Sequence, residues 1–176
     1  MALSQHLSKF NWRLMLVHFF ACLFLIHSFR DFYFLNDFKF KMDLLNHLKN
    51  NKMDVEWMSK NYNAAWIVQI GRWSILIGYI GLLTGFLISL IISIKQHWYW
   101  LNSLIVFIVT FVLIRFGIFN WKYVYYIFQF AEIPFKRTNP WCYFTNGLVM
   151  LSIGLLLFFL KTSNKFIKSG FKRTID

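Results

Sequence analysis

Acidic residues are scarce in this chain, and its long apolar runs contain none. Seven Asp and Glu stand against nineteen Lys and Arg, which gives a formal net charge of +12 at pH 7. Proton relays and cation-coupled transport inside a membrane depend on carboxylates held at depth. We therefore do not expect this chain alone to form a proton-coupled or cation-coupled transporter.

Cysteines and catalytic patterns are equally sparse. Cys22 and Cys142 form no CxxC pair and have no histidine at metal-ligand spacing, so we interpret both as structural. His18 and His27 are nine residues apart, on opposite faces of a helix, and cannot share a ligand. The chain contains no HExxH, GxSxG, P-loop or glycine-rich dinucleotide motif. We expect no cofactor or metal, and we name no catalytic residue.

Apolar and aromatic side chains, in contrast, are abundant. Hydrophobic residues make up 58% of the chain and aromatic residues 22%, whereas charged residues make up only 15%. About 20 apolar residues of helix cross a hydrocarbon layer that is roughly 30 Å thick. We therefore predict an all-α, polytopic integral membrane protein that forms a single membrane domain over residues 1–176. The four predicted transmembrane helices cover about residues 14–30, 72–94, 98–115 and 143–160.

Two further segments are predicted to lie on the membrane surface as amphipathic interfacial helices. Within residues 37–58, apolar residues recur at helical spacing with lysine and asparagine between them. Residues 117–133 are rich in aromatic side chains, but Lys122 lies near the middle and Pro134 would break a longer helix. Both segments are too polar or too interrupted to add a fifth crossing.

The distribution of basic residues favours cytoplasmic N- and C-termini. Residues 1–13, the 95–97 turn and the tail from Lys161 together carry eight Lys and Arg against a single acid, Asp176. Small size and the lack of an organelle signal predict the bacterial inner (plasma) membrane. The basic residues are spread between the apolar runs, so we expect contact with membrane lipids and no nucleic-acid partner.

The shortest connection predicts the firmest tertiary contact. Only Lys95, Gln96 and His97 separate the second apolar run from the third. So short a turn forces the two helices to be antiparallel neighbours. Trp98 and Trp100 follow at once, as expected for aromatic residues that anchor a helix at the membrane interface.

Small residues form a stripe along the second apolar run. Its members are Gly78, Gly81, Gly85, Ser89 and Ser93. Small side chains let a second backbone approach closely, which is how helices associate in lipid. One interpretation is a face for a second copy of the chain or a partner membrane protein. The other is packing within the chain on the third or fourth run, where Gly147 and Gly154 would supply a facing groove.

Basic residues are also predicted to gather near the outer ends of the helices. They are Arg30, Arg72, Arg115, Lys136 and Arg137. Arg72 and Arg115 both lie about 30 Å along their helices from the inner turn, which places them at one depth. Basic groups at one level could hold a phosphate, a lipid headgroup or a carboxylated substrate. Alternatively, each arginine pairs locally, for example with Asp31 or Glu132.

Two functional hypotheses follow from these patterns. The first is a non-catalytic membrane subunit or accessory protein that acts through helix–helix and lipid contacts, and the small-residue stripe motivates it. The second is a binder, transporter or enzyme for an anionic lipid-linked substrate at the outer membrane–water interface, and the arginines motivate it. Because acidic and nucleophilic groups are scarce, the binding form of the second hypothesis is favoured over the enzymatic form.

Overall fold

The computed structural model describes residues 10–36, 38–49, 60, 62–117, 127–129, 135 and 138–172. Within these ranges all regular secondary structure is helical. The helices are α2 (Trp12–Leu35), α3 (Phe38–Lys49), α5 (Ala64–Lys95), α6 (Leu101–Arg115), α8 (Pro140–Phe159) and α9 (Lys161–Lys172).

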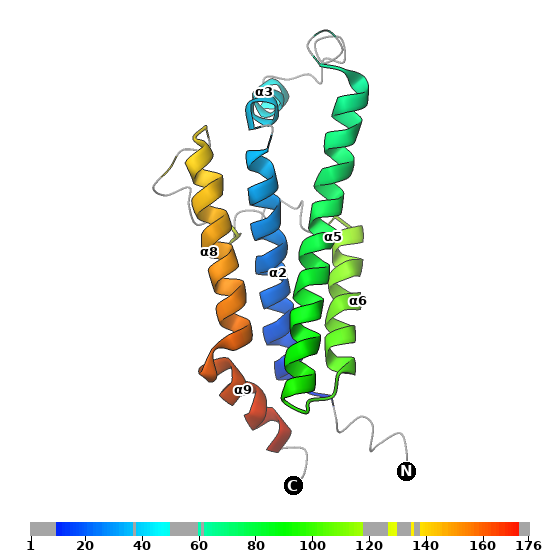
Figure 1. Cartoon of the computed structure of the whole chain (residues 1–176), viewed down its shortest axis with the longest axis vertical. Helices are drawn as coiled ribbons and strands as arrows, with labels where there is room; N and C mark the ends of the chain where they lie inside the picture. Colours follow the sequence, from blue (N-terminus) through cyan, green and yellow to red (C-terminus); the bar gives the residue numbers. More distant parts are fainter. Residues whose placement is uncertain are drawn as a thin grey trace.

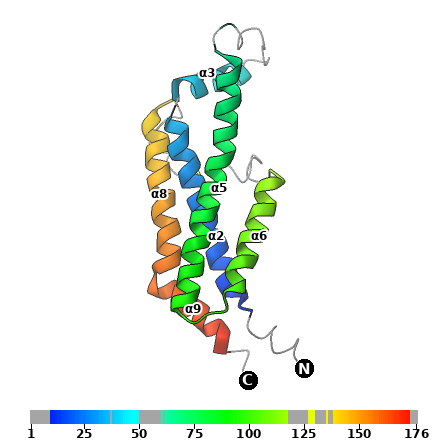
Figure 2. The ribbon, with the colours of Figure 1, turned by 45° about the vertical axis from the view of Figure 1, so that its right-hand side comes forward.

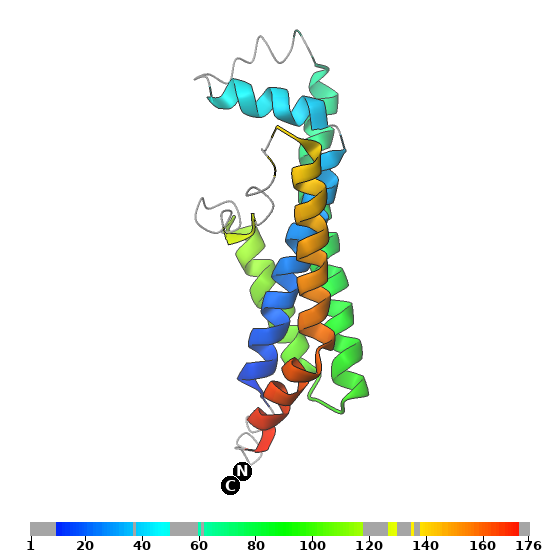
Figure 3. The ribbon, with the colours of Figure 1, turned by 90° about the vertical axis from the view of Figure 1, so that its left-hand side faces the viewer.

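Helix α2 is the centre of the fold. It lies between α8 and α5, with α6 beside the half of α5 that leads into the turn between them (Figures 1 and 2). Of the helices described, α3, α5, α6, α8 and α9 all contact α2. Figure 3 shows α3 lying across one end of the bundle, while α9 runs obliquely at the opposite end. The first apolar run of the sequence is therefore the one that the others surround.

Asparagine residues define where the long helices begin. Asn11, Asn63 and Asn139 each accept a backbone N–H bond from the first turn of α2, α5 and α8, respectively. An asparagine oxygen at this position satisfies an N–H that has no partner inside the helix. Pro140, which follows Asn139, suits the first helical position because it has no N–H to satisfy.

Three helices are long and apolar enough to cross a membrane, namely α2, α5 and α8. The third predicted span is shorter than expected, because α6 begins at Leu101 and has 15 residues. Trp98 belongs to the turn instead, where its N–H bonds to the carbonyl of Ser93 at 2.8 Å, and His97 takes a positive φ of 55°. At 1.5 Å per residue, α6 measures about 22 Å, less than the roughly 30 Å hydrocarbon layer.

The first predicted span is longer than expected. Helix α2 continues through Arg30 and Asp31 to Leu35. The predicted run 14–30 contains no acidic residue, but the helix extends beyond it and thereby includes Asp31. The Asp31 carboxylate accepts a hydrogen bond of 2.5 Å from the side chain of Asn146 on α8. An interhelical partner explains how a carboxylate can be accommodated in an otherwise apolar helix.

The interfacial segments are described only in part. Helix α3 lies inside the predicted segment 37–58, of which residues 37 and 50–58 are outside the described ranges. Lys41 on α3 donates 2.6 Å hydrogen bonds to the carbonyls of Tyr33 and Asn36, so it caps the end of α2. Of the predicted segment 117–133, the structure describes residues 117 and 127–129.

We did not predict helix α9 from the sequence, because we interpreted the residues from Lys161 as a basic tail. It begins after a break at Leu160 and packs against the start of α2. The side chain of Asn11 donates to the carbonyl of Ile167 at 2.9 Å, and Ile167 is fully buried. The start of α2 and the helix α9 therefore lie at the same end of the bundle.

Candidate functional site

The glycines of the predicted stripe pack against α2. A β-carbon added to Gly81 would lie 2.9 Å from the α-carbon of Ile26. One added to Gly85 would lie 2.7 Å from the sulfur of Cys22 and 3.3 Å from its α-carbon. These distances leave no room for a side chain, so the missing side chains let the α5 and α2 backbones approach closely. The helix that packs against Gly81 and Gly85 is therefore the first apolar run. For packing within the chain we had expected the third or fourth run instead.

The serines of the stripe form a buried polar chain. Ser89 donates its hydroxyl to Ser103 at 2.8 Å, and Ser93 and Ser103 share a hydrogen bond of 2.9 Å. His18 Nδ1 lies 2.7 Å from the Ser89 oxygen, and all four side chains are fully buried. Sequence reasoning did not single out Ser103, because a lone serine in an apolar run carries no spacing signal. This chain ties α2, α5 and α6 together by hydrogen bonds.

The two glycines of the fourth run also face α2. A β-carbon at Gly147 would lie 2.9 Å from the ring of Phe32, and one at Gly154 would lie 3.2 Å from the carbonyl oxygen of Ala21. Ser28 donates its hydroxyl to the Gly147 carbonyl at 2.8 Å. Glycines on α5 and on α8 therefore both pack on α2, and they do not form one groove with each other.

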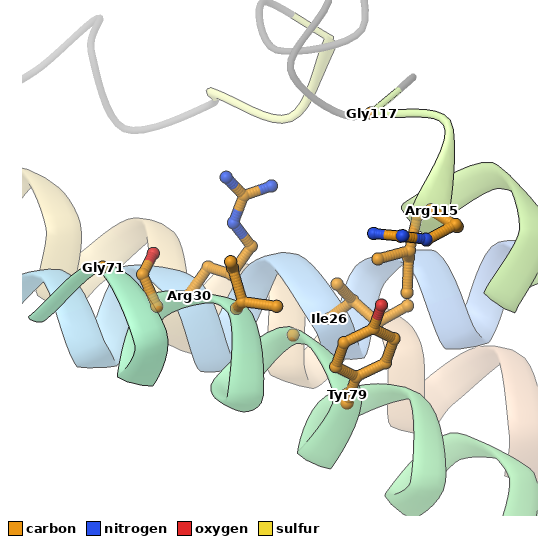
Figure 4. Close-up of a pocket in the computed structure, with 10 residues that line it drawn as sticks. Ile26, Arg30, Gly71, Tyr79, Arg115 and Gly117 are labelled. Carbon is orange, nitrogen blue, oxygen red and sulfur yellow. The ribbon is translucent and has the colours of Figure 1, made fainter. Parts of the chain in front are cut away.

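Gly78 has a different environment from the rest of the stripe. A β-carbon at this position would meet no atom within 4 Å, although Gly78 itself is buried. The residue lines a cavity of about 440 Å³ between α2, α5 and α6 (Figure 4). The described lining consists of Ile26, Arg30, Gly71, Ser74, Ile75, Gly78, Tyr79, Ile114, Arg115 and Gly117. We call this cavity the arginine pocket.

Two of the five predicted basic residues meet in the arginine pocket. Arg30 comes from α2 and Arg115 from the end of α6, and Figure 4 shows their guanidinium groups at two sides of the hollow. Arg72 is exposed on α5 and is not among the lining residues, so shared depth alone did not bring it to the site. Lys136 and Arg137 lie outside the described residues.

Glycines give the arginine pocket its space. Gly71, like Gly78, would place a β-carbon in open space, so both positions hold the hollow open along α5. Gly117 has a φ of 68° and its N–H bonds to the carbonyl of Ile114 at 3.0 Å, which ends α6 at the pocket rim. Glycine adopts this left-handed conformation without the strain that a side chain would add.

The chemistry of the lining is amphipathic. The hydroxyl-bearing residues Ser74 and Tyr79 accompany the two arginines, while Ile26, Ile75 and Ile114 supply apolar wall. Such a lining can hold an anionic group at the guanidinium end and apolar chain beside it.

A polar cluster on the α8 side of α2 lies outside the arginine pocket. Asn146 donates to the Asp31 carboxylate and, at 2.9 Å, to the carbonyl of Phe128. The ring of His27 stacks on the ring of Phe128 with 4.2 Å between centroids. Asp31 is not among the described lining residues of the pocket. The acid therefore faces α8 while the neighbouring Arg30 faces the cavity.

Comparisons with known proteins add no family or relative. The chain matches no protein-family model, no curated protein and no solved structure. Within the described ranges no three side chains of His, Cys, Asp or Glu gather closely enough to hold a metal ion.

Proposed function

We propose that this chain is an integral membrane protein that binds the anionic headgroup of a lipid, or of a lipid-linked substrate, in the arginine pocket. The observation that carries the proposal is the meeting of Arg30 and Arg115 on one cavity of about 440 Å³. A guanidinium group is planar, permanently charged and able to bind two oxygens of a phosphate or carboxylate at once. Two such groups at one hollow favour an anion that can bridge them.

The apolar part of the pocket supports a lipid over a water-soluble anion. Ile75 lines the pocket and is 61% exposed, so the cavity opens onto the apolar outer surface of the bundle. A headgroup could therefore meet the arginines while its acyl chains remain in the surrounding hydrocarbon. A free inorganic anion would gain nothing from the isoleucine wall.

We also propose that the chain crosses the membrane four times and that both of its termini lie in the cytoplasm. Helix α6 would complete its crossing through Trp100 and Phe116, which flank it and are 49% and 75% exposed. Aromatic residues at both ends anchor a helix at the interfaces, and local bilayer thinning accommodates a short one. The start of α2 and α9 lie at one end of the bundle, which an even number of crossings requires. The proposed location is the bacterial inner membrane.

The test compares lipid retention by matched arginine variants. The purified protein is mixed with phosphatidylglycerol and phosphatidylcholine of identical acyl chains, and bound lipid is counted by native mass spectrometry. Arg30→Gln combined with Arg115→Gln should lower the preference for phosphatidylglycerol about tenfold or more, because each basic residue near an anionic surface contributes about 1 kcal/mol. Arg72→Gln removes one such charge outside the pocket, and should leave the preference near its original value.

A second variant tests the cavity rather than its charge. Gly78→Leu places a side chain in the space that the headgroup would occupy, and should also reduce retention of phosphatidylglycerol. The proposal is wrong if the folded double arginine variant keeps its preference, or if Arg72→Gln lowers it equally.

The accessory-subunit hypothesis is the alternative proposal. Because α2 already covers Gly81 and Gly85, a partner would have to use the exposed apolar faces of α5 or α8, where Leu83 and Leu148 are 50% and 43% exposed. A stable complex in native mass spectrometry that Leu83→Ala or Leu148→Ala weakens would support this alternative.

A further inference from the structure

A second cavity lies near the outer end of the α2–α5 pair. It measures about 350 Å³, and its described lining consists of Tyr33, Asn36, Trp66, Gln69, Ile70, Trp73 and Ile77. We call it the aromatic pocket. The hydroxyl of Tyr33 donates to the carbonyl of Ile70 at 3.1 Å and joins the two helices at its wall. Its α5 residues lie on a different face of that helix from those of the arginine pocket, so the two cavities are separate sites.

The position of Trp66 is fixed by other aromatic rings. Phe40 packs edge-on against it at 4.6 Å between centroids, and Tyr62 stacks nearly parallel to it at 5.7 Å. Phe40 is only 4% exposed, so this support is part of the packed structure. A ring that is already held in place loses little freedom when a ligand binds against it.

The lining is uncharged but rich in hydrogen-bonding groups. None of the described lining residues carries a charge, and the amides of Asn36 and Gln69 supply both donors and acceptors. Tyr33, Trp66 and Trp73 add aromatic faces, whose negative potential attracts polarised C–H groups. A sugar ring presents hydroxyls at its edge and C–H groups on its face, and it matches both features.

A nearby lysine argues against a cationic ligand. Three aromatic rings could also form a cage for a quaternary ammonium group. However, the ammonium of Lys41 already lies 3.8 Å from the centre of the Tyr33 ring. A choline headgroup would meet like charge at this wall, whereas a neutral sugar would not.

The depth of the pocket agrees with a headgroup ligand. Helix α5 has 32 residues and is therefore about 48 Å long, well beyond the roughly 30 Å hydrocarbon layer. Counted from Lys95 at its inner end, about 20 residues fill that layer and reach Ile75. Trp66, Gln69 and Trp73 then lie at or beyond its outer boundary, among the lipid headgroups.

We propose that the aromatic pocket binds the sugar ring of an uncharged glycolipid. This site is independent of the anion site proposed above, because a neutral sugar needs neither Arg30 nor Arg115. The headgroup would lie against Trp66 and Trp73, with its hydroxyls bonded to the amides of Asn36 and Gln69. Its acyl chains would enter the bilayer beside Ile77.

The test uses monoglucosyl diacylglycerol as the probe. Protein in a polyoxyethylene detergent, which carries no sugar, is mixed with equal amounts of this lipid, diacylglycerol and phosphatidylcholine with the same acyl chains. Native mass spectrometry should show preferential retention of the glucosyl lipid. Trp73→Ala should reduce that preference about tenfold, through loss of one aromatic contact together with the area it buries. Trp100→Ala is the matched control, since Trp100 and Trp73 are 49% and 47% exposed.

Two further variants keep the outcome decisive. Gln69→Ala removes an exposed amide without touching the packed rings and should also weaken retention, so it carries the test if Trp73→Ala does not fold. Arg30→Gln with Arg115→Gln should leave retention of the glucosyl lipid unchanged. The proposal is overturned if Trp73→Ala and Gln69→Ala retain the glucosyl lipid as the original protein does. It is equally overturned if phosphatidylcholine is the preferred lipid.

Discussion

Two glycines that are three residues apart in α5 should respond in opposite ways to the same substitution. In Gly81→Ala, the new methyl carbon would lie 2.9 Å from the α-carbon of Ile26, a backbone atom that cannot rotate away. In Gly78→Ala, the new methyl carbon would meet no atom within 4 Å. The first change must push α5 away from α2, whereas the second only occupies part of a cavity.

The structure sets the sign and approximate size of each effect. Forcing an extra carbon into a packed interface costs about 1–3 kcal/mol. Replacing a helical glycine by alanine returns about 0.5–1 kcal/mol through the backbone. Gly81→Ala should therefore lower the free energy of unfolding by about 1–2 kcal/mol, since the packing cost exceeds the backbone gain. Gly78→Ala should leave it unchanged or raise it by up to about 1 kcal/mol.

Unfolding of the purified protein by SDS in mild-detergent micelles, followed by circular dichroism, measures these differences. Both variants have the same composition, so effects of the assay itself cancel between them. If Gly81→Ala proves as stable as Gly78→Ala, the close contact between α5 and α2 does not exist and the placement of the stripe is wrong.

Two further predictions concern polar contacts. Asn146→Leu should destabilise the protein by about 1–3 kcal/mol in the same unfolding assay, because the Asp31 carboxylate and the Phe128 carbonyl lose their donor; an unchanged midpoint would contradict this. Partial burial and the hydrogen bond to Asp43 raise the pKa of Tyr62 above its ordinary value of 10.0, so the bond persists at lower pH and is lost as pH rises through the raised pKa. Tyrosinate absorbance, taken as the difference from Tyr62→Phe, should show ionisation at lower pH in Asp43→Asn.

The sequence predicted the helical class and one tertiary contact. The antiparallel pairing of α5 and α6 is confirmed, because a connection as short as Lys95, Gln96 and His97 leaves the chain no other choice. The expected apolar helices are present as α2, α5 and α8. Their ends were predicted less well, since charged residues such as Arg30 and Arg72 were taken as boundaries although a helix can continue through them.

The neighbours of each face could not be predicted from spacing. A stripe such as Gly81 and Gly85 identifies a face of one helix, but every small-residue face is compatible with any close-packing partner. A shared depth along the helices likewise did not predict which arginines line one cavity. Arg30 and Arg115 share a cavity and Arg72 does not, because direction around the helix decides which side chains meet. The sequence did contain a signal for helix α9, because Lys161, Lys165 and Lys168 share one helical face and the buried Ile167 lies on another.

The central place of α2 has a consequence for biogenesis. The ribosome makes α2 before α5 and α8, yet the two glycine-bearing surfaces that enclose α2 belong to those later helices. Until α8 has been made, Ser28 has no carbonyl of Gly147 to bond, and the flank of α2 that α8 covers stays open. Assembly of the bundle can therefore finish only after α8 has been made.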